Sequence, residues 1–181
     1  IISPEIGLDT DAIAAALYSG GSEKDRFWSE MAKDLFRGLA LFVLEQDELP
    51  HTFGEILRQA SGKGKTLKEH VTEIIQERDE RSKSDPRVKP FSDACRDSLS
   101  RILANSENTL ASIISTFNTP LLLFQNPRAD MATSRSDFDL RDVRRKRMSV
   151  YFAVQPDRLH QASVLVNLFF DQLLNLNTRA L

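Results

Sequence analysis

The chain has 181 residues, of which 41% are hydrophobic and 28% are charged, and its formal net charge is -2. This composition is ordinary for a soluble protein of one good-sized domain, and no apolar run is long enough to predict a membrane-spanning helix. The single cysteine, Cys95, excludes a disulfide within the chain and favours a reducing compartment, where a small buried residue on a helix is its expected role.

The first predicted elements are an extended lead-in over residues 1–8 and a short alanine-rich helix over residues 12–18. Residues 23–46 then place apolar side chains at the i, i+1, i+4, i+5 spacing of a helix with a broad apolar face. Ser22 is its predicted N-cap. The apolar face is too wide for one neighbour, so this helix is predicted to be the centre of a bundle. Its aromatic residues are Phe27, Trp28, Phe36 and Phe42.

Two capping boxes follow the long helix. Residues 52–55 (TFGE) predict the start of a helix that ends near residue 59, and residues 66–69 (TLKE) predict one that ends near residue 78. Between them, residues 61–66 (SGKGKT) resemble a phosphate-binding loop only at their end. Such a loop needs a glycine where Gln59 stands and a strand before it, so a turn between helices is predicted.

Residues 79–89 are charged, contain a proline and lack apolar periodicity, which predicts a mobile loop. Helical periodicity returns from Phe91 and breaks at residues 105–106, where a serine is placed to cap the next helix. A proline at residue 120 predicts a short helical turn over residues 121–124. The sequence therefore predicts an all-α domain over residues 1–127.

The pattern changes over residues 128–181. Residues 148–154 (MSVYFAV) are rich in β-branched and aromatic side chains, which predicts a strand buried on both faces, and residues 157–176 predict a last helix. A lone strand leaves its backbone hydrogen-bonding groups unpaired. Residues 1–2 are one candidate for a short strand that pairs with it. The simpler expectation is that the chain is part of a larger α/β protein, with the helical domain inserted between two pieces of its sheet.

Charge is distributed unevenly along the sequence. Residues 1–57 carry 11 acidic and 4 basic side chains, whereas residues 58–89 and residues 128–181 each carry 9 basic and 6 acidic ones. An acidic surface repels a phosphate backbone and attracts a basic protein surface. The N-terminal third therefore favours a basic protein partner over DNA, although a solvated helix face would give the same pattern.

Several stretches also resemble a known family. Residues 27–40 (FWSEMAKDLFRGLA) resemble the start of the all-α domain in type IV secretion coupling proteins, the hexameric ATPases that feed substrates to a secretion channel. Residues 133–144 (TSRSDFDLRDVR), 149–152 (SVYF) and 168–172 (LFFDQ) resemble the passage by which that family's chain re-enters its nucleotide-binding domain. Their order and spacing agree with the family over most of the chain.

The resemblance implies a RecA-like ATPase core, an N-terminal membrane anchor and an all-α insertion on the cytoplasmic side of the bacterial inner membrane. The insertion is implicated in recognising protein substrates, which are relaxases carrying DNA or effectors. The phosphate loop would lie before Ile1 and the Mg²⁺-binding strand end after Leu181. ATP and Mg²⁺ are therefore expected in the parent protein, and no cofactor, catalytic residue or membrane contact is expected here.

Two sets of residues remain as weaker candidates for chemistry. The three histidines are far apart and lack acidic or cysteine neighbours at ligand spacing, so surface or capping roles are predicted for His51, His70 and His160. The dense basic run consists of Arg144, Arg145, Lys146 and Arg147. It predicts contact with DNA or an acidic partner, or else a solvated segment or a contact with the rest of the parent ATPase.

The leading hypothesis is a non-catalytic domain that binds the secretion signal of an effector or relaxase protein, next to the rest of the hexameric ATPase and the channel. Its surface is expected on the acidic long-helix region and on the loops after residues 49 and 78. The candidate residues are Glu45, Glu48, Glu55, Lys63, Lys65, Arg78 and Arg81. Two alternatives stay open, namely a helical DNA-binding domain that assists conjugative transfer and a structural lid that regulates the parent ATPase.

Overall fold

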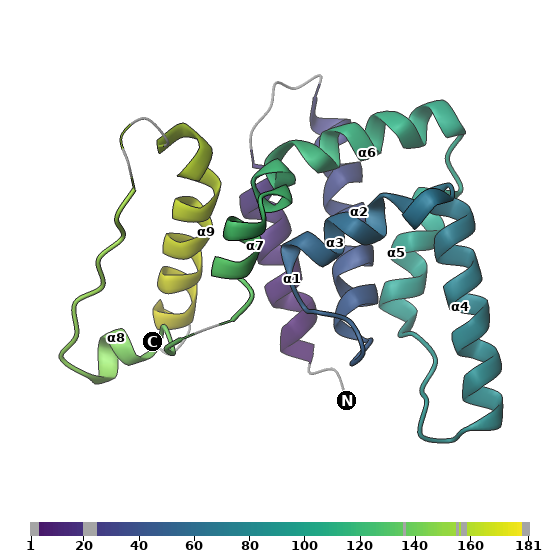
Figure 1. The fold of residues 1–181 in the computed structure, drawn as a ribbon, viewed down its shortest axis with the longest axis horizontal. Coiled ribbons are helices and arrows are strands. Elements are labelled where there is room, and N and C mark those ends of the chain that lie inside the picture. The colour runs from purple at the N-terminus through teal and green to yellow at the C-terminus, as the bar shows by residue number, and fades with distance from the viewer. Residues whose placement is uncertain (1–3, 20–24, 136, 155, 157–158, 179–181) are drawn as a thin grey trace.

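The computed structural model describes residues 4–19, 25–135, 137–154, 156 and 159–178 (Figure 1). This described part of the chain is mainly helical and contains no strand. Two short 3-10 turns, Gly62–Gly64 and Leu122–Gln125, accompany the α-helices. The α-helices are α1 (Pro4–Leu17), α2 (Arg26–Leu44), α3 (Phe53–Ala60), α4 (Leu67–Ser84), α5 (Asp93–Leu103), α6 (Glu107–Leu121), α7 (Pro127–Ala132), α8 (Asp142–Arg145) and α9 (Leu159–Thr178).

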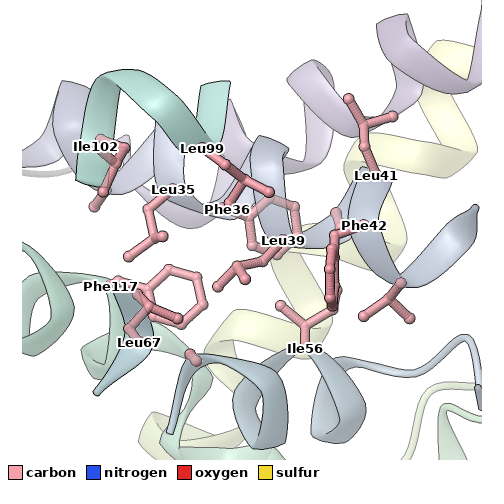
Figure 2. Close-up of a cluster of buried hydrophobic side chains, with 14 of the residues drawn as sticks. Leu35, Phe36, Leu39, Leu41, Phe42, Ile56, Leu67, Leu99, Ile102 and Phe117 are labelled. Atoms are coloured by element: carbon pink, nitrogen blue, oxygen red, sulfur yellow. The ribbon is translucent and has the colours of Figure 1, made fainter. Parts of the chain in front are cut away.

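Helix α2 lies at the centre of the bundle, as its wide apolar face predicts. Helices α1, α3, α5 and α6 all pack on it (Figure 1). Its side chains Leu35, Phe36 and Leu39 are almost completely buried. Figure 2 shows this cluster together with residues from four other helices, namely Ile56, Leu67, Leu99, Ile102 and Phe117. Because α1, α3, α5 and α6 all contact α2, these helices depend on it for the burial of their apolar faces.

Local end signals place several helix starts correctly. Thr66 and Glu69 form the predicted capping box of α4: the Glu69 N–H donates to the Thr66 hydroxyl at 3.2 Å, and the Thr66 N–H donates to the Glu69 carboxylate at 3.0 Å. Thr52 caps α3, accepting the Glu55 N–H at 3.1 Å, but the Glu55 carboxylate bonds to other side chains. Ser106 caps α6 as predicted. These caps are set by residues only three positions apart.

The end of α4 differs from the prediction. The sequence predicts an end near residue 78 and a mobile loop over residues 79–89, whereas the helix continues to Ser84. Asp79 accepts a hydrogen bond from Arg96 of α5 at 3.0 Å, which ties this part of α4 to the bundle. Helix α4 ends where Pro86 disfavours a helical conformation of the residue before it. The loop is therefore shorter than the sequence suggests.

The first and last helices also have different bounds. Helix α1 begins at Pro4, so residues 4–8 are helical and not extended as predicted, because proline is tolerated in the first turn of a helix. Helix α9 is described over Leu159–Thr178, so it extends two residues beyond the predicted end at residue 176, while the predicted start at residue 157 lies outside the described residues. It contacts α1, and its Leu168 is buried. The predicted Ser22 cap and the two N-terminal isoleucines lie outside the described residues.

The strand predicted over residues 148–154 is wrong for this chain. These residues form no paired strand, and their side chains are exposed where burial on both faces was expected; Tyr151 is 90% exposed. A strand needs a neighbour to pair its backbone groups, and the described residues supply none. Phe152 contacts α9, with its ring centre 5.5 Å from that of Phe169.

Candidate functional site

A groove of about 720 Å³ lies between the C-terminal end of α2, the second half of α4 and the loop that joins α4 to α5. Apolar side chains from three elements line part of it, namely Leu44, Ile74, Val88 and Pro90. Both signs of charge surround them, from Glu45, Asp47, Glu48, Glu77, Arg78, Arg81, Arg87 and Lys89. A groove of this size and lining suits a protein segment that carries apolar and charged side chains together.

Four of the seven candidate partner residues line this groove: Glu45, Glu48, Arg78 and Arg81. The chain positions them on different elements, and the fold brings them together. Glu48 and Arg81 form an ion pair of 3.4 Å, with side chains that are 70% and 60% exposed. Such a solvated pair contributes little stability. Each of the two side chains can therefore leave this ion pair and bind an opposite charge of a partner at a low cost in free energy.

Two other charged residues give the groove fixed walls. The Glu45 carboxylate accepts a hydrogen bond from the Ser92 N–H at 2.8 Å and another from the Ser92 hydroxyl at 2.5 Å, which ties the end of α2 to the start of α5. The Arg78 Nε donates to the Lys89 carbonyl at 2.7 Å, and its guanidinium lies 4.4 Å from the ring centre of Phe91. This cation–π contact and hydrogen bond hold the α4–α5 loop against α4.

Sequence reasoning missed other charged residues of the groove. Asp47 and Glu77 are exposed acids, and Arg87 is held by both carboxylate oxygens of Asp85 at 3.0 and 2.9 Å. A signal for Glu77 was present, because residues 74, 77, 78 and 81 repeat at helical spacing. Continuing the α4 periodicity beyond residue 78 would have placed them on one face.

Glu55 lies elsewhere, buried in α3. Its carboxylate accepts hydrogen bonds from the Arg58 Nε at 2.7 Å and the Gln59 Nε2 at 2.6 Å, and Lys63 lies at 3.4 Å. The Gln59 Oε1 is in turn 2.7 Å from the His70 Nε2 of α4. The structure thus gives Glu55 a place in a buried polar network, and a contact with a partner stays a prediction.

The SGKGKT segment forms the predicted turn between helices. All three residues of Gly62–Gly64 have positive φ angles, of 70°, 49° and 92°. Lys63 reaches Glu55, and Lys65 forms an ion pair with Glu73 on α4. The element before the turn is α3 and not a strand, so the geometry of a phosphate-binding loop is missing.

The buried network makes stability depend on pH. Burial raises the pKa of Glu55, but the hydrogen bonds from Arg58 and Gln59 and the charge of Lys63 outweigh it and hold the pKa below the ordinary 4.5. Burial, together with the charge of Lys63, lowers the pKa of His70 below the ordinary 6.5. Both folded-state pKa values therefore lie below those of the unfolded chain. The free energy of unfolding falls as pH drops below 6.5, and falls further below 4.5.

We expect Glu55→Gln to flatten the part of this pH dependence that lies below pH 4.5. Each unit of difference between the folded and unfolded pKa is worth about 1.4 kcal/mol. Urea unfolding followed by circular dichroism between pH 3 and pH 7, roughly the range in which carboxylates and histidine titrate, measures the change. Glu80→Gln on the exposed side of α4 is the matched control. Parallel curves for wild type and Glu55→Gln would contradict the stated role of Glu55.

The basic run lies on and after α8, at the opposite end of the fold from α4 (Figure 1). Arg144 donates to the Asn177 carbonyl of α9, and Lys146 pairs with Asp142 at 2.7 Å. Arg145 and Arg147 are exposed. The structure therefore separates the basic run from the groove, and the two surfaces can be tested independently.

Other site types find no support among the described residues. Within them, no group of three His, Cys, Asp or Glu side chains is placed to hold a metal ion. Across the same ranges, none of the helices combines the length and apolar character that a bilayer crossing requires. Cys95 is fully buried, as predicted, and burial raises the pKa of its thiol. His51 contacts the Gln46 carbonyl at 3.2 Å, while the side chain of His160 lies outside the described part.

Comparisons with known proteins agree with the resemblance seen in the sequence. Residues 4–181 match the family "Type IV secretory system Conjugative DNA transfer". Protein VirD4 of Agrobacterium fabrum (strain C58 / ATCC 33970) is 43% identical over 61 residues, which cover 34% of this chain and 9% of VirD4. Protein VirD4 of Rhizobium radiobacter is 32% identical over 104 residues, which cover 52% of this chain and 15% of that protein.

The chain thus spans only a small part of these relatives, and no solved structure gives a significant match. The family match nevertheless extends over nearly every residue. The chain therefore belongs to the type IV secretion family of conjugative DNA transfer proteins, as a region of a coupling protein.

Proposed function

We propose that this helical region recognises the secretion signal of a transferred protein, an effector or a relaxase, and that the groove between α2 and α4 is its docking surface. The observation that carries the proposal is the meeting of four separately predicted residues, Glu45, Glu48, Arg78 and Arg81, around one groove of about 720 Å³. Membership of a conjugative transfer family supports a role next to transferred substrates.

The charges of the groove favour a protein segment over nucleic acid. Four acidic and four basic side chains line it, so the groove lacks the excess of positive charge that binding to a phosphate backbone needs. Asp47 and Glu48 also follow the C-terminal end of α2, where the helix dipole is negative. A cationic side chain of the partner would be stabilised there, while Arg81 on the opposite wall would pair with an acidic one. The apolar lining would accept the side chains between them.

Arg81→Glu is expected to weaken binding of the signal about tenfold, because it places a negative charge opposite Glu48 and removes one of the four cations that line the groove. Titration calorimetry at moderate salt measures this, with the C-terminal signal region of a secreted protein encoded beside the same secretion genes. Lys83→Glu is the matched control: it makes the same charge change two residues later, about 200° around α4.

A DNA duplex titrated in parallel tests the main alternative, which is DNA binding. Equal affinities of Arg81→Glu and Lys83→Glu for the signal would contradict docking in the groove. Binding to duplex DNA alone would replace the proposal by a DNA-binding function, for which the exposed run Arg144–Arg147 is the available surface. If the region binds neither the signal nor DNA, and if its deletion from the parent protein alters ATP turnover, the result would favour a regulatory lid.

We also propose that residues 1–127 form the inserted all-α domain and that residues 128–181 return to the nucleotide-binding domain of the parent. The exposed apolar side chains of this segment support the proposal, among them Tyr151 at 90% and Leu174 at 61%. A neighbouring sheet would pair the extended backbone of residues 148–154. Their amides should exchange slowly in the full-length protein and fast in this chain alone; equal rates would contradict the proposal.

On this proposal the region itself is not catalytic. ATP and Mg²⁺ would bind in other parts of the parent, at the cytoplasmic face of the inner membrane, close to the secretion channel. The absence of a phosphate-loop geometry around Gly62–Gly64 supports this division of labour. ATP turnover by residues 1–181 alone would overturn it.

A further inference from the structure

The part of the chain that follows the bundle has few buried side chains. Phe124 is 2% exposed, and its ring stacks on that of Phe53 with centres 4.5 Å apart. Beyond it, no described side chain is buried until Leu168 of α9. Helix α7 lies within this stretch, so burial of apolar side chains cannot determine its position on the bundle.

A single carboxylate supplies a contact that determines the position of α7 on the bundle. Asp130 of α7 accepts a hydrogen bond from the Gly54 N–H at 3.0 Å, and its second oxygen lies 3.6 Å from the Arg58 Nη1. Both partners belong to α3, and the Asp130 side chain is only 20% exposed. The first turn of a helix presents unpaired N–H groups and the positive end of the dipole, so a carboxylate is favourable there.

Gly54 leaves the space that this carboxylate occupies. A Cβ atom on Gly54 would lie 2.4 Å from the carboxyl carbon and from both oxygens of Asp130. Alanine is ordinarily more stable than glycine within a helix. At this position alanine would instead push the carboxylate away from α3. The glycine and the aspartate, 76 residues apart, therefore form one matched contact.

The same contact is connected to the groove helix. Arg58 forms ion pairs with both Asp130 and Glu55, and Glu55 is linked through Gln59 to His70 of α4. We infer that Asp130 is a latch that holds α7 on the bundle. Breaking the Asp130 contact releases α7, while the core around α2 stays folded and α9 stays packed on α1. The inference does not depend on what the groove binds.

Hydrogen exchange measured by mass spectrometry tests the latch. Asp130→Asn and Gly54→Ala should each make the amides of α7 exchange about tenfold faster, and leave those of α2 and α5 unchanged. Asp137→Asn is the matched control, since it neutralises an exposed carboxylate of the same segment that pairs only with Arg135 in the described contacts.

The two variants distinguish a latch from a local effect on α7. Asp130 is itself in the first turn of α7, so Asp130→Asn alone could weaken that helix. Gly54→Ala changes only α3, and an effect on α7 must pass through the contact. The double variant should exchange no faster than Asp130→Asn. Wild-type protection of α7 in Gly54→Ala, or additive effects of the two substitutions, would overturn the inference.

Discussion

Phe36→Ala is expected to lower the free energy of unfolding by about 3 to 5 kcal/mol. Phe36 is 1% exposed in the middle of α2, and its ring centre lies 6.3 Å from those of Tyr18, which directly follows α1, and Phe53 in α3. Truncation to alanine would leave a cavity where three helices meet, and the surrounding side chains can only partly fill it. Urea unfolding followed by circular dichroism measures the loss.

Phe27→Ala is the matched control for this prediction. Both phenylalanines lie on α2 and undergo the same substitution, but Phe27 is 54% exposed, and its ring centre lies 5.1 Å from that of the neighbouring Trp28. Its loss should cost less than about 1 kcal/mol. Equal losses in the two variants would contradict the position of α2 at the centre of the bundle.

Gly38→Val is expected to lower the free energy of unfolding by about 1 to 3 kcal/mol. Helices α2 and α5 cross at Gly38, where a Cβ atom would lie 2.9 Å from the Leu99 Cδ2 and 3.3 Å from the Leu99 backbone nitrogen. The Gly38 carbonyl also accepts the Cys95 thiol at 3.6 Å. Valine would separate the two helices and weaken the burial of both.

Two further variants identify the cause of this loss. Ser100→Val places the same β-branched residue on the exposed face of α5, and should cost less than about 1 kcal/mol. Leu99→Ala removes the side chain that the new valine would meet. When Gly38→Val and Leu99→Ala are combined, the loss in the free energy of unfolding should therefore be smaller than the sum of the two single losses. Full additivity would show that helix propensity, and not the close approach to Leu99, is responsible.

Local features of the fold were accessible from the sequence because their causes lie within a few residues. The Thr66 and Glu69 capping box joins atoms three residues apart, and the face of α2 follows from periodicity within one helix. The end of α4 was not accessible in this way. Its continuation to Ser84 involves Asp79 and Arg96, which are 17 residues apart on different helices.

The candidate site shows the same division. The sequence identified Glu48 and Arg81 as separate charges, but their meeting across 33 residues depends on how α2 and α4 pack. Glutamate usually lies at the surface of a protein. The carboxylate of Glu55 is buried because Gln59 and Lys63 approach it and bind it. No local pattern distinguishes such an acid from an exposed one.

The sequence by itself determined that the chain is mainly helical, that α2 is the central helix, and that the coupling-protein family is the one it resembles, because periodicity, capping and motif order are properties of neighbouring residues. The tertiary structure alone decided the groove, the contact between Asp130 and Gly54, and the unpaired state of residues 148–154. Each of these depends on which distant segments meet, or on a partner strand that the described residues do not contain.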